Sequence, residues 1–312
     1  RRFSIQSVSK PFVYGIALED RGRARVAQAI GVEPSGDPFN AISLEPGTGR
    51  PMNPMINAGA IAAASLVAGD SDDARLQRVL DALSAWAGRP LDIDQAIFES
   101  ERDTGHRNRA IGHMLRNHGI IDGDPEPALG LYFRQCAVRV DCRDLALMAA
   151  TLANGGLHPL TGRRAVRADC IEPMLSVMTT CGMYDDSGTW VDAVGLPAKS
   201  GVGGGIIAVL PGQLGIGVYS PRLDARGNSA RGVAVCRRIS ADLGLHFLAP
   251  PRPSVAALRA RYHLHSMRSK RRRPAADEHR LQDLGLKTQV FELQGDLRWA
   301  TLEPVLRAIV DG

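Results

Sequence analysis

The sequence lacks the long apolar segments of membrane and secreted proteins. It contains no run of about 18 apolar residues, so no transmembrane helix is predicted. The charged start, Arg1-Arg2, is not followed by the apolar core of about 7–15 residues that a signal peptide needs. Apolar residues make up 44% of the chain and charged residues 23%, which is typical of a globular protein. We therefore expect a cytoplasmic protein with no membrane partner.

Cysteine and histidine are present, but without the spacing of a disulfide framework or a metal site. The five cysteines are an odd number, and none of them forms a Cys-x-x-Cys pair. The eight histidines show no ligand spacing either. We expect reduced, mostly buried thiols, no metal and no cofactor.

A general excess of basic residues is also absent. The formal charge is +5, and five positive side chains lie within residues 268–273. A nucleic-acid-binding domain spreads its basic charge over a folded face rather than over one short segment. The basic run is therefore assigned to a linker, and no nucleic-acid partner is expected.

The composition changes near residue 249, where prolines interrupt regular structure. The basic run follows, and residues 255–265 between them could form a short helix. Residues 249–285 are therefore predicted to be a linker containing one helix and the basic run. This leaves residues 1–248 as the main domain.

The main domain has the pattern of an α+β protein. Asp141 is a predicted N-cap for a helix with apolar residues at helical spacing. Apolar runs at 206–210 and 214–219 flank Pro-Gly-Gln and predict a β-hairpin. Another helix follows, capped by Asn228 or Ser229. Helices followed by antiparallel strands and a closing helix favour α+β over a doubly wound parallel sheet.

Near the start of the chain, Ser7 and Lys10 form a Ser-x-x-Lys pair. Residues three apart share one face of a helix, so the lysine amine can reach the serine hydroxyl. Burial lowers the pKa of a lysine and allows it to act as a base for serine. Ser9 is less suitable because adjacent residues do not face each other. Taken alone, the pair is weak evidence, since a capping serine beside a surface lysine has the same spacing.

A second motif, Lys199-Ser200-Gly201, precedes the predicted hairpin. An early Ser-x-x-Lys with a late Lys-Ser/Thr-Gly is typical of penicillin-binding proteins and class A β-lactamases. Their middle motif, Ser-Asp-Asn or Tyr-x-Asn, is missing here. The nearest match, Ser71-Asp72-Asp73, is better explained as a solvated turn.

Five longer segments occur in order between and around these motifs. They are EPSGDPFN at 33–40, NPMINAGAI at 53–61, residues 100–108, CGMYD at 181–185 and GLPAKSG at 195–201. Together they resemble the serine-dependent glutaminases, from about residue 3 to residue 247. The resemblance implies a β-lactamase/transpeptidase-like α+β fold, with an antiparallel sheet and a helical subdomain. It also implies hydrolysis of L-glutamine to L-glutamate and ammonia through an acyl-enzyme.

The resemblance further implies roles for residues at matching positions. Ser7 would be the nucleophile, Lys10 its general base, and Tyr184 a proton shuttle in place of the missing middle motif. The backbone N–H groups of Ser7 and Val202 would form an oxyanion hole. The residues implied to contact the substrate are Gln6, Ser7, Asn57, Glu101, Asn108, Tyr132, Tyr184 and Val202.

Some of these residues also have a purely structural explanation. Asn57 could be a turn or helix cap, Glu101 and Asn108 could be a surface pair, and Tyr132 could be a core residue.

The substrate-binding roles are also chemically sensible. Glutamine has an ammonium group with which Glu101 can pair, and a carboxylate that amides and hydroxyls can bind.

The end of the chain, residues 286–312, has a second resemblance. A strand at 288–293, a Gly295-Asp296 turn and a helix at 300–310 are similar to the opening of a STAS domain, the fold of anti-sigma-factor antagonists. One strand and one helix cannot bury a core. We therefore expect a partial STAS-like βα unit.

The position of Ser7 suggests a truncated sequence, because this fold needs strands before the nucleophile helix. Two alternatives to an active glutaminase remain open. One is an impaired, truncated glutaminase that acts only as a binding or regulatory module, and the other is a β-lactamase-like hydrolase. The family resemblance also implies a homodimer or homotetramer.

Overall fold

The computed structural model describes residues 1–36, 41–249, 257–267, 271–295 and 299–310. The chain forms two compact units, Arg1–Leu248 and Ala249–Gly312. None of the helices in these described ranges combines the length and apolar composition needed to cross a bilayer.

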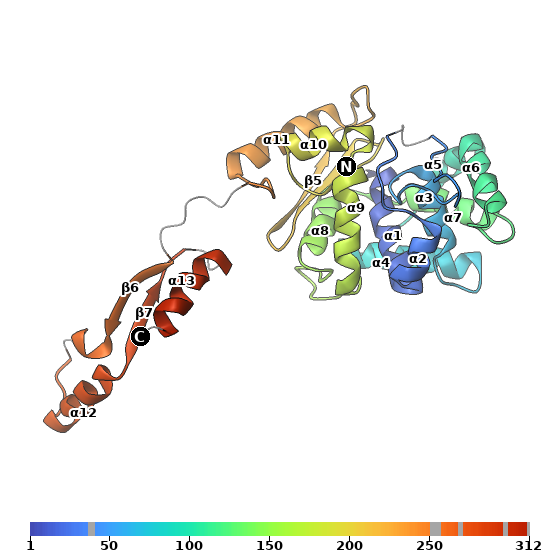
Figure 1. The fold of residues 1–312 in the computed structure, drawn as a ribbon. Coiled ribbons are helices and arrows are strands. Elements are labelled where there is room, and N and C mark those ends of the chain that lie inside the picture. The colour runs from blue at the N-terminus through green and yellow to red at the C-terminus, as the bar shows by residue number, and fades with distance from the viewer. Residues whose placement is uncertain (37–40, 250–256, 268–270, 296–298, 311–312) are drawn as a thin grey trace. The chain divides into compact units, whose positions relative to one another are not determined.

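Unit 1 opens with a short strand, followed by a helical part in which α1 to α7 lie together (Figure 1). Strand β1 (Phe3–Ser4) pairs antiparallel with β2 (Arg139–Val140). The 3-10 helix η1 (Gln6–Ser9) follows β1 directly. The helices of this part are α1 (Lys10–Arg21), α2 (Arg23–Ala29), α3 (Asn57–Ser65), α4 (Asp72–Ala87), α5 (Gln95–Thr104), α6 (His106–Asn117) and α7 (Glu126–Cys136).

Helix α3 is the centre of this helical part. All of its residues except Ser65 are buried, and it contacts α1, α6 and α7. Its sequence, NAGAIAAAS, is rich in alanine, which favours helix and lets neighbouring helices approach closely. The N-terminus of α3 is thereby fixed in the core, with Asn57 as its first residue.

The second part of unit 1 combines a three-stranded sheet with helices on both faces. Strands β3 (Ala198–Ser200), β4 (Gly205–Leu210) and β5 (Leu214–Tyr219) are antiparallel in that order, so the predicted hairpin is confirmed. The other helical elements here are α8 (Cys142–Ala153), η2 (Ala168–Cys170), α9 (Ile171–Cys181), η3 (Tyr184–Asp186), α10 (Ser187–Ala193) and α11 (Ala230–Leu243).

Strand β4 is buried on both faces. Ile207 and Val209 belong to the large core that includes α8, whereas Ile206 and Ala208 pack in a second core with Cys236 of α11. Side chains of a strand alternate between its two faces, so a continuous apolar run is what a doubly covered strand requires. The confirmed hairpin is therefore the layer between the two cores.

Glycines in β5 allow α8 to lie against the sheet. A Cβ atom added to Gly217 would lie 2.4 Å from the Ala146 nitrogen, and one added to Gly215 would lie 2.1 Å from the Ala150 nitrogen. No side chain fits between these backbones. The two glycines thus set how closely helix and sheet approach.

The predicted caps identify the ends of two helices. The Asp141 side chain accepts from the Arg143 and Asp144 backbone N–H groups and caps α8. Ser229, rather than Asn228, caps α11 by accepting from Gly232 N at 3.1 Å. Four of the five cysteines are buried, as expected, and Cys142 is exposed.

Unit 2 contains a hairpin and two helices. Strands β6 (Leu258–His263) and β7 (Gln289–Leu293) pair antiparallel, and η4 (Leu264–Ser266), α12 (Ala275–Leu286) and α13 (Trp299–Val310) complete the described elements. The strand and helix predicted near the C-terminus are confirmed. Asp296 of the predicted turn lies outside the described residues.

The helix predicted within 255–265 is wrong for residues 258–263, which form β6. These residues alternate between half-buried and exposed positions, which is the period of a strand. Their partner strand, β7, follows about thirty residues later, as in the pair Tyr262↔Val290. Among the described residues of 249–285, residues 258–263 therefore form a strand and residues 275–285 belong to α12.

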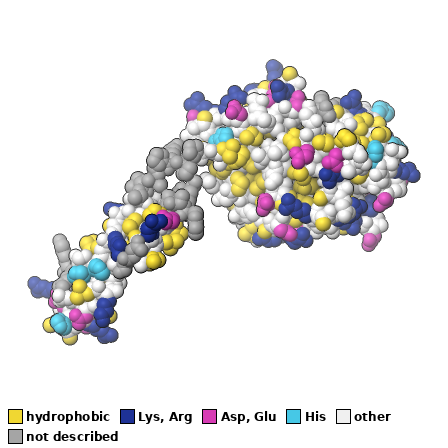
Figure 2. All heavy atoms as spheres, viewed as in Figure 1, with side chains coloured by type: hydrophobic (Ala, Val, Ile, Leu, Met, Phe, Trp, Pro, Cys, Tyr) yellow, Lys and Arg dark blue, Asp and Glu magenta, His cyan; other side chains and the backbone are white. Residues whose placement is uncertain are grey.

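Charge on the surface of unit 1 is mixed. On the face shown in Figure 2, basic and acidic side chains are interspersed rather than gathered by sign. Many of the arginines are paired, for example Arg78 with Glu19 and Asp20 at 2.8 and 2.9 Å.

Candidate active site

Ser7 and Lys10 lie at the junction of η1 and α1. Both are buried, with Ser7 5% exposed and Lys10 completely enclosed. Because residues i and i+3 eclipse each other in a 3-10 helix, this turn aligns Lys10 with Ser7 more directly than the predicted α-helix would. Pro11 follows at the start of α1, where its missing N–H costs no hydrogen bond.

Two residues have an unusual backbone conformation at this point. Gln6, with φ 52°, and Tyr184, with φ 59°, are the non-glycine residues with positive φ in the described part of the chain. One immediately precedes Ser7, and the other hydrogen-bonds to the Ser7 side chain. Such left-handed conformations cost free energy and concentrate at functional sites.

The Lys10 amine is held by groups from the loop before α3 and from α3 itself. Its Nζ donates to Asn57 Oδ1 at 2.6 Å and to the Met55 carbonyl at 3.2 Å. Burial lowers the pKa of Lys10 to about 8, while the charges of Cys136 and Glu101 oppose this shift. A neutral amine is thereby accessible near physiological pH.

Tyr184 and a second buried lysine, Lys199, complete the candidate reactive cluster of Ser7, Lys10, Tyr184 and Lys199. The Tyr184 hydroxyl donates to the Ser200 carbonyl at 3.0 Å, and burial raises the pKa of this tyrosine. Lys199 Nζ lies 4.1 Å from the centre of the Tyr184 ring and donates to the Gly182 and Ser200 carbonyls at 3.0 and 2.6 Å. Burial, reinforced by the positive charge of Lys10, lowers the pKa of Lys199.

This contact of Lys199 with Tyr184 is one that the sequence did not predict. The Lys-Ser-Gly motif indicated a strand at this position, but it did not predict which residue Lys199 contacts. The Lys199 amine lies 4.1 Å from the centre of the Tyr184 ring, and this packing helps fix the ring.

The residues implied to bind substrate come from separate helices and meet at this site. Gln6 Nε2 donates to Glu101 Oε1 of α5 at 3.3 Å. Asn57 Nδ2 donates to Asn108 Oδ1 of α6 at 3.0 Å. Glu101 and Asn108 are half-buried and bond to these partners rather than forming an exposed pair with each other.

Tyr132, in the middle of α7, lies next to the same cluster. It is buried, and burial raises its pKa, with further contributions from Cys136, Glu101 and Tyr184. Glu101 and Tyr184 thus act electrostatically on the Tyr132 side chain.

The loop that contains Val202 packs on η1. A Cβ atom added to Gly201 would lie 3.2 Å from the Ile5 carbonyl oxygen and 3.3 Å from the Val8 nitrogen. Within the described ranges, the Val202 N–H has no hydrogen-bond acceptor, and the residue is 37% exposed. An N–H without an acceptor beside the Ser7 turn is available to a substrate oxygen.

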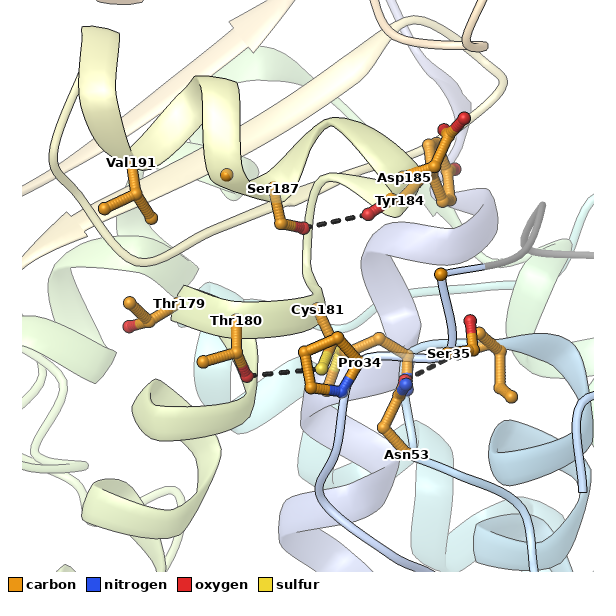
Figure 3. A pocket seen from close by; sticks show the side chains of 14 residues that line it. Pro34, Ser35, Asn53, Thr179, Thr180, Cys181, Tyr184, Asp185, Ser187 and Val191 are labelled. Carbon is orange, nitrogen blue, oxygen red and sulfur yellow. Dashed lines mark hydrogen bonds between the residues drawn. The ribbon is translucent and has the colours of Figure 1, made fainter. Parts of the chain in front are cut away.

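A cavity of about 510 Å³ borders Tyr184 on another side (Figure 3). Its walls include Tyr184, Met55 and Asn53, but neither Ser7 nor Lys10, so it lies beside the reactive pair rather than over it. Asn53 Nδ2 donates to the Glu33 carbonyl at 2.9 Å and anchors the segment that continues into the cavity wall at residues 34–36. The rest of the 33–40 motif lies outside the described residues.

Residues 1–248 match the protein-family model described as Glutaminase. The chain belongs to the glutaminase family. The glutaminase of Trichormus variabilis is 57% identical over 244 residues, which is 78% of this chain and 73% of that protein. The Corynebacterium efficiens glutaminase is 44% identical over 311 residues, covering 99% of this chain and 69% of that protein.

Solved glutaminase structures have the same fold. The crystal structure of Mglu matches with a TM-score of 0.83 and 43% identity, over 100% of this chain and 73% of that one. The probable glutaminase ybaS matches with a TM-score of 0.78 and 41% identity, over 80% and 81%. The expectation of mixed helices and strands in a glutaminase-like fold is therefore confirmed.

Proposed function

We propose that this glutaminase-family chain hydrolyses the side-chain amide of L-glutamine through an acyl-enzyme on Ser7. The observation that supports this most directly is that Ser7 and Lys10 are both buried, three residues apart, and that the Tyr184 side chain hydrogen-bonds to Ser7. A β-lactamase-like arrangement of Ser-x-x-Lys and Lys-Ser-Gly around one sheet edge agrees with the same chemistry.

In the first half-reaction, neutral Lys10 takes the proton of Ser7 as the serine oxygen attacks the amide carbon. The N–H groups of Ser7 and Val202 bind the oxyanion. Tyr184 then gives its proton to the leaving nitrogen, which departs as ammonia, and Tyr184 recovers a proton from Lys10. Water reverses the sequence in the second half-reaction: its oxygen bonds to the acyl carbon, its proton passes to the base, and Ser7 regains its hydroxyl proton as glutamate leaves.

The proposed substrate pocket follows from the hydrogen bonds around this cluster. The Glu101 carboxylate, which accepts from Gln6, would pair with the substrate ammonium. The amides of Asn57 and Asn108 and the Tyr132 hydroxyl would donate to the substrate carboxylate. A pocket that meets both charges rejects simple amides, because its buried polar groups would be left without partners.

Glu101→Gln is expected to raise KM for L-glutamine by about 100-fold or more, with a smaller change in kcat, because the ammonium loses its charged partner. Ammonia release measured over a range of glutamine concentrations separates the two effects. Glu99→Gln is the matched control, since Glu99 lies on the same helix, is exposed and bonds to Gln95. Equal KM values for the two variants would show that Glu101 does not bind the substrate.

A comparison of substrates tests the reaction itself. The wild-type chain should release ammonia from L-glutamine and leave nitrocefin unchanged. Hydrolysis of nitrocefin without turnover of glutamine would instead support a β-lactamase-like hydrolase.

The pH dependence of kcat/KM is expected to follow the ionisation of Lys10. Since its pKa is lowered to about 8, the amine is mostly charged below that pH and mostly neutral above it. About a tenth of the lysine is neutral at pH 7, so kcat/KM should rise several-fold towards about pH 8.5. At higher pH the substrate ammonium that Glu101 is proposed to bind loses its proton, so kcat/KM should fall again. Initial rates at low glutamine concentration measure this. A profile that is flat from pH 6.5 to pH 9 would contradict Lys10 as the base.

We also propose that residues 286–312 form a STAS-like strand–helix unit. Strand β7 followed by helix α13 is the order that the resemblance implies, and β6 pairs with the same strand.

A further inference from the structure

A second cavity lies at the opposite end of two helices that begin at the active site. Helix α1 begins at Lys10 and ends at Arg21, and α3 begins at Asn57 and ends at Ser65. At about 1.5 Å per residue, these ends are about 16 Å and 12 Å from the catalytic ends. A cavity of about 600 Å³ has both Arg21 and Ser65 in its wall. It is therefore separate from the site around Ser7.

The lining of the cavity combines apolar and charged side chains. Leu66, Ile121 and Ala128 line it and are each buried. The charged side chains in its lining are Arg21, Arg25, Arg75, Asp122 and Asp124. They come from α1, α2, α4 and the segment between α6 and α7, so the fold brings them together from distant parts of the sequence.

Backbone carbonyls hold two of these arginines in place, but no carboxylate pairs with any of the three within the described residues. Arg21 Nε donates to the Leu66 carbonyl at 2.9 Å, and Arg75 Nε donates to the Gly69 carbonyl at 3.3 Å. A guanidinium has five N–H donors, so each of these two keeps most of its donors for another partner. Throughout the described residues, neither these two nor Arg25 forms an ion pair, in contrast to nearby Arg78 with its two acidic partners.

The two aspartates are likewise without a cationic partner in the part of the chain that the structure describes. Asp124 Oδ1 accepts from the Glu126 backbone N–H at 3.0 Å, which positions it at the start of α7. Three positive and two negative side chains thus surround one cavity without forming ion pairs among themselves. Their charges complement a molecule that has two carboxylates and one ammonium group.

We propose that this cavity is a second ligand site that binds an acidic α-amino acid, with the arginines on its carboxylates and the aspartates on its ammonium. Guanidinium groups bind carboxylates through paired hydrogen bonds, so arginine is well suited to bind the carboxylates of such a ligand. An inorganic anion would leave both aspartates facing a negative charge. The site does not depend on the chemistry proposed for Ser7, because its lining shares no residue with that cluster.

Isothermal titration with L-glutamate tests the proposal on the full chain. The decisive variant is Arg25→Glu, because Arg25 is exposed and none of its described contacts holds the backbone. Arg23→Glu is the matched control, since Arg23 is exposed on the same helix and does not line the cavity. Arg25→Glu is expected to bind one glutamate fewer per chain, or to bind it at least about tenfold more weakly, whereas Arg23→Glu should match the wild type.

Further ligands and a second variant define the class of molecule. Glutarate, which lacks the ammonium group, should bind at least about tenfold more weakly than L-glutamate to the wild type, and inorganic phosphate should not compete. Asp122→Asn should reduce this preference for glutamate over glutarate, and it serves as the test if Arg25→Glu does not fold. Identical glutamate isotherms for the wild type, Arg25→Glu and Asp122→Asn would overturn the proposal, as would tighter binding of phosphate than of glutamate.

A kinetic measurement separates this site from the catalytic one. Arg25→Glu should turn over L-glutamine within about twofold of the wild type in the absence of added glutamate, because Arg25 touches no residue of the Ser7 cluster. Loss of the second glutamate site with unchanged turnover supports the second site alone. If the wild-type protein is inactive but still binds glutamate in a way that depends on Arg25, the proposed function is contradicted and the second site is still supported.

Discussion

Replacement of Ser7 by alanine is expected to lower kcat for L-glutamine by about 10³- to 10⁶-fold, because the covalent half-reactions disappear with the hydroxyl. The side chain is small and lies in a turn that keeps its backbone hydrogen bonds, so the folded structure should persist. Ammonia release gives the rate, and a thermal melt compares folding with the wild type.

Ser9→Ala is the control that distinguishes the two serines of the turn. The Ser9 hydroxyl donates to the Gln6 carbonyl at 2.8 Å and accepts from Gln135 Nε2 at 3.3 Å. Both bonds hold the turn in place, so the role of Ser9 is structural. Its removal should cost about tenfold or less in kcat. After rapid quenching, mass spectrometry should find the glutamyl group on the peptide that contains Ser7. Loss of activity in Ser9→Ala, with activity retained in Ser7→Ala, would assign the nucleophile to Ser9.

Lys10→Met has the second largest expected effect, a loss of about 10²- to 10⁴-fold in kcat, because the serine loses its base. Methionine fills similar space without an amine. It leaves Asn57 Oδ1 and the Met55 carbonyl without their donor, so we expect a loss of about 1–3 kcal/mol in the free energy of unfolding. Kinetics and chemical denaturation measure the two effects separately.

The matched control is Lys199→Met, since Lys199 is also fully buried with a lowered pKa. Lys199 contacts the Tyr184 ring and two backbone carbonyls, so its loss should disturb the position of Tyr184 while Lys10 remains as the base. The Lys199 variant should therefore retain a rise in kcat/KM with pH near 8, and the Lys10 variant should lose it. The reverse result would make Lys199 the base.

Local signals predicted the parts of the site that depend on neighbours in the chain. Ser7 and Lys10 are three residues apart, and any helical turn brings such residues to one side. The caps Asp141 and Ser229 and the hairpin of β4 and β5 likewise depend on short sequence patterns, and the structure agrees with them.

Short sequence patterns could not predict the contacts between residues that are far apart in the chain. Gln6 and Glu101 are 95 positions apart, and Asn57 and Asn108 are 51 apart, so only resemblance to a known family could suggest that they share a pocket. The ring of Tyr184 over Lys199 depends on how η3 packs on β3, which no spacing encodes.

The strand β6 was missed for a related reason. Taken alone, its residues are compatible with a short helix, and only pairing with β7 makes a strand the better solution. Tertiary context of this kind overrides local propensity.

The burial of α3 has a consequence for how substrate preference can change in this chain. Asn57 is the first residue of a helix whose side chains, apart from the last, are enclosed by three other helices. We propose that Asn57 lines the substrate pocket, so a substitution there that alters substrate preference also disturbs a densely packed interior. Such a substitution is tolerated only while the free energy of unfolding stays high enough. Glu101 and Asn108, on half-buried helix faces, are free of this constraint. New specificities in this scaffold should accordingly arise first at α5 and α6, and at α3 only after stabilising changes elsewhere.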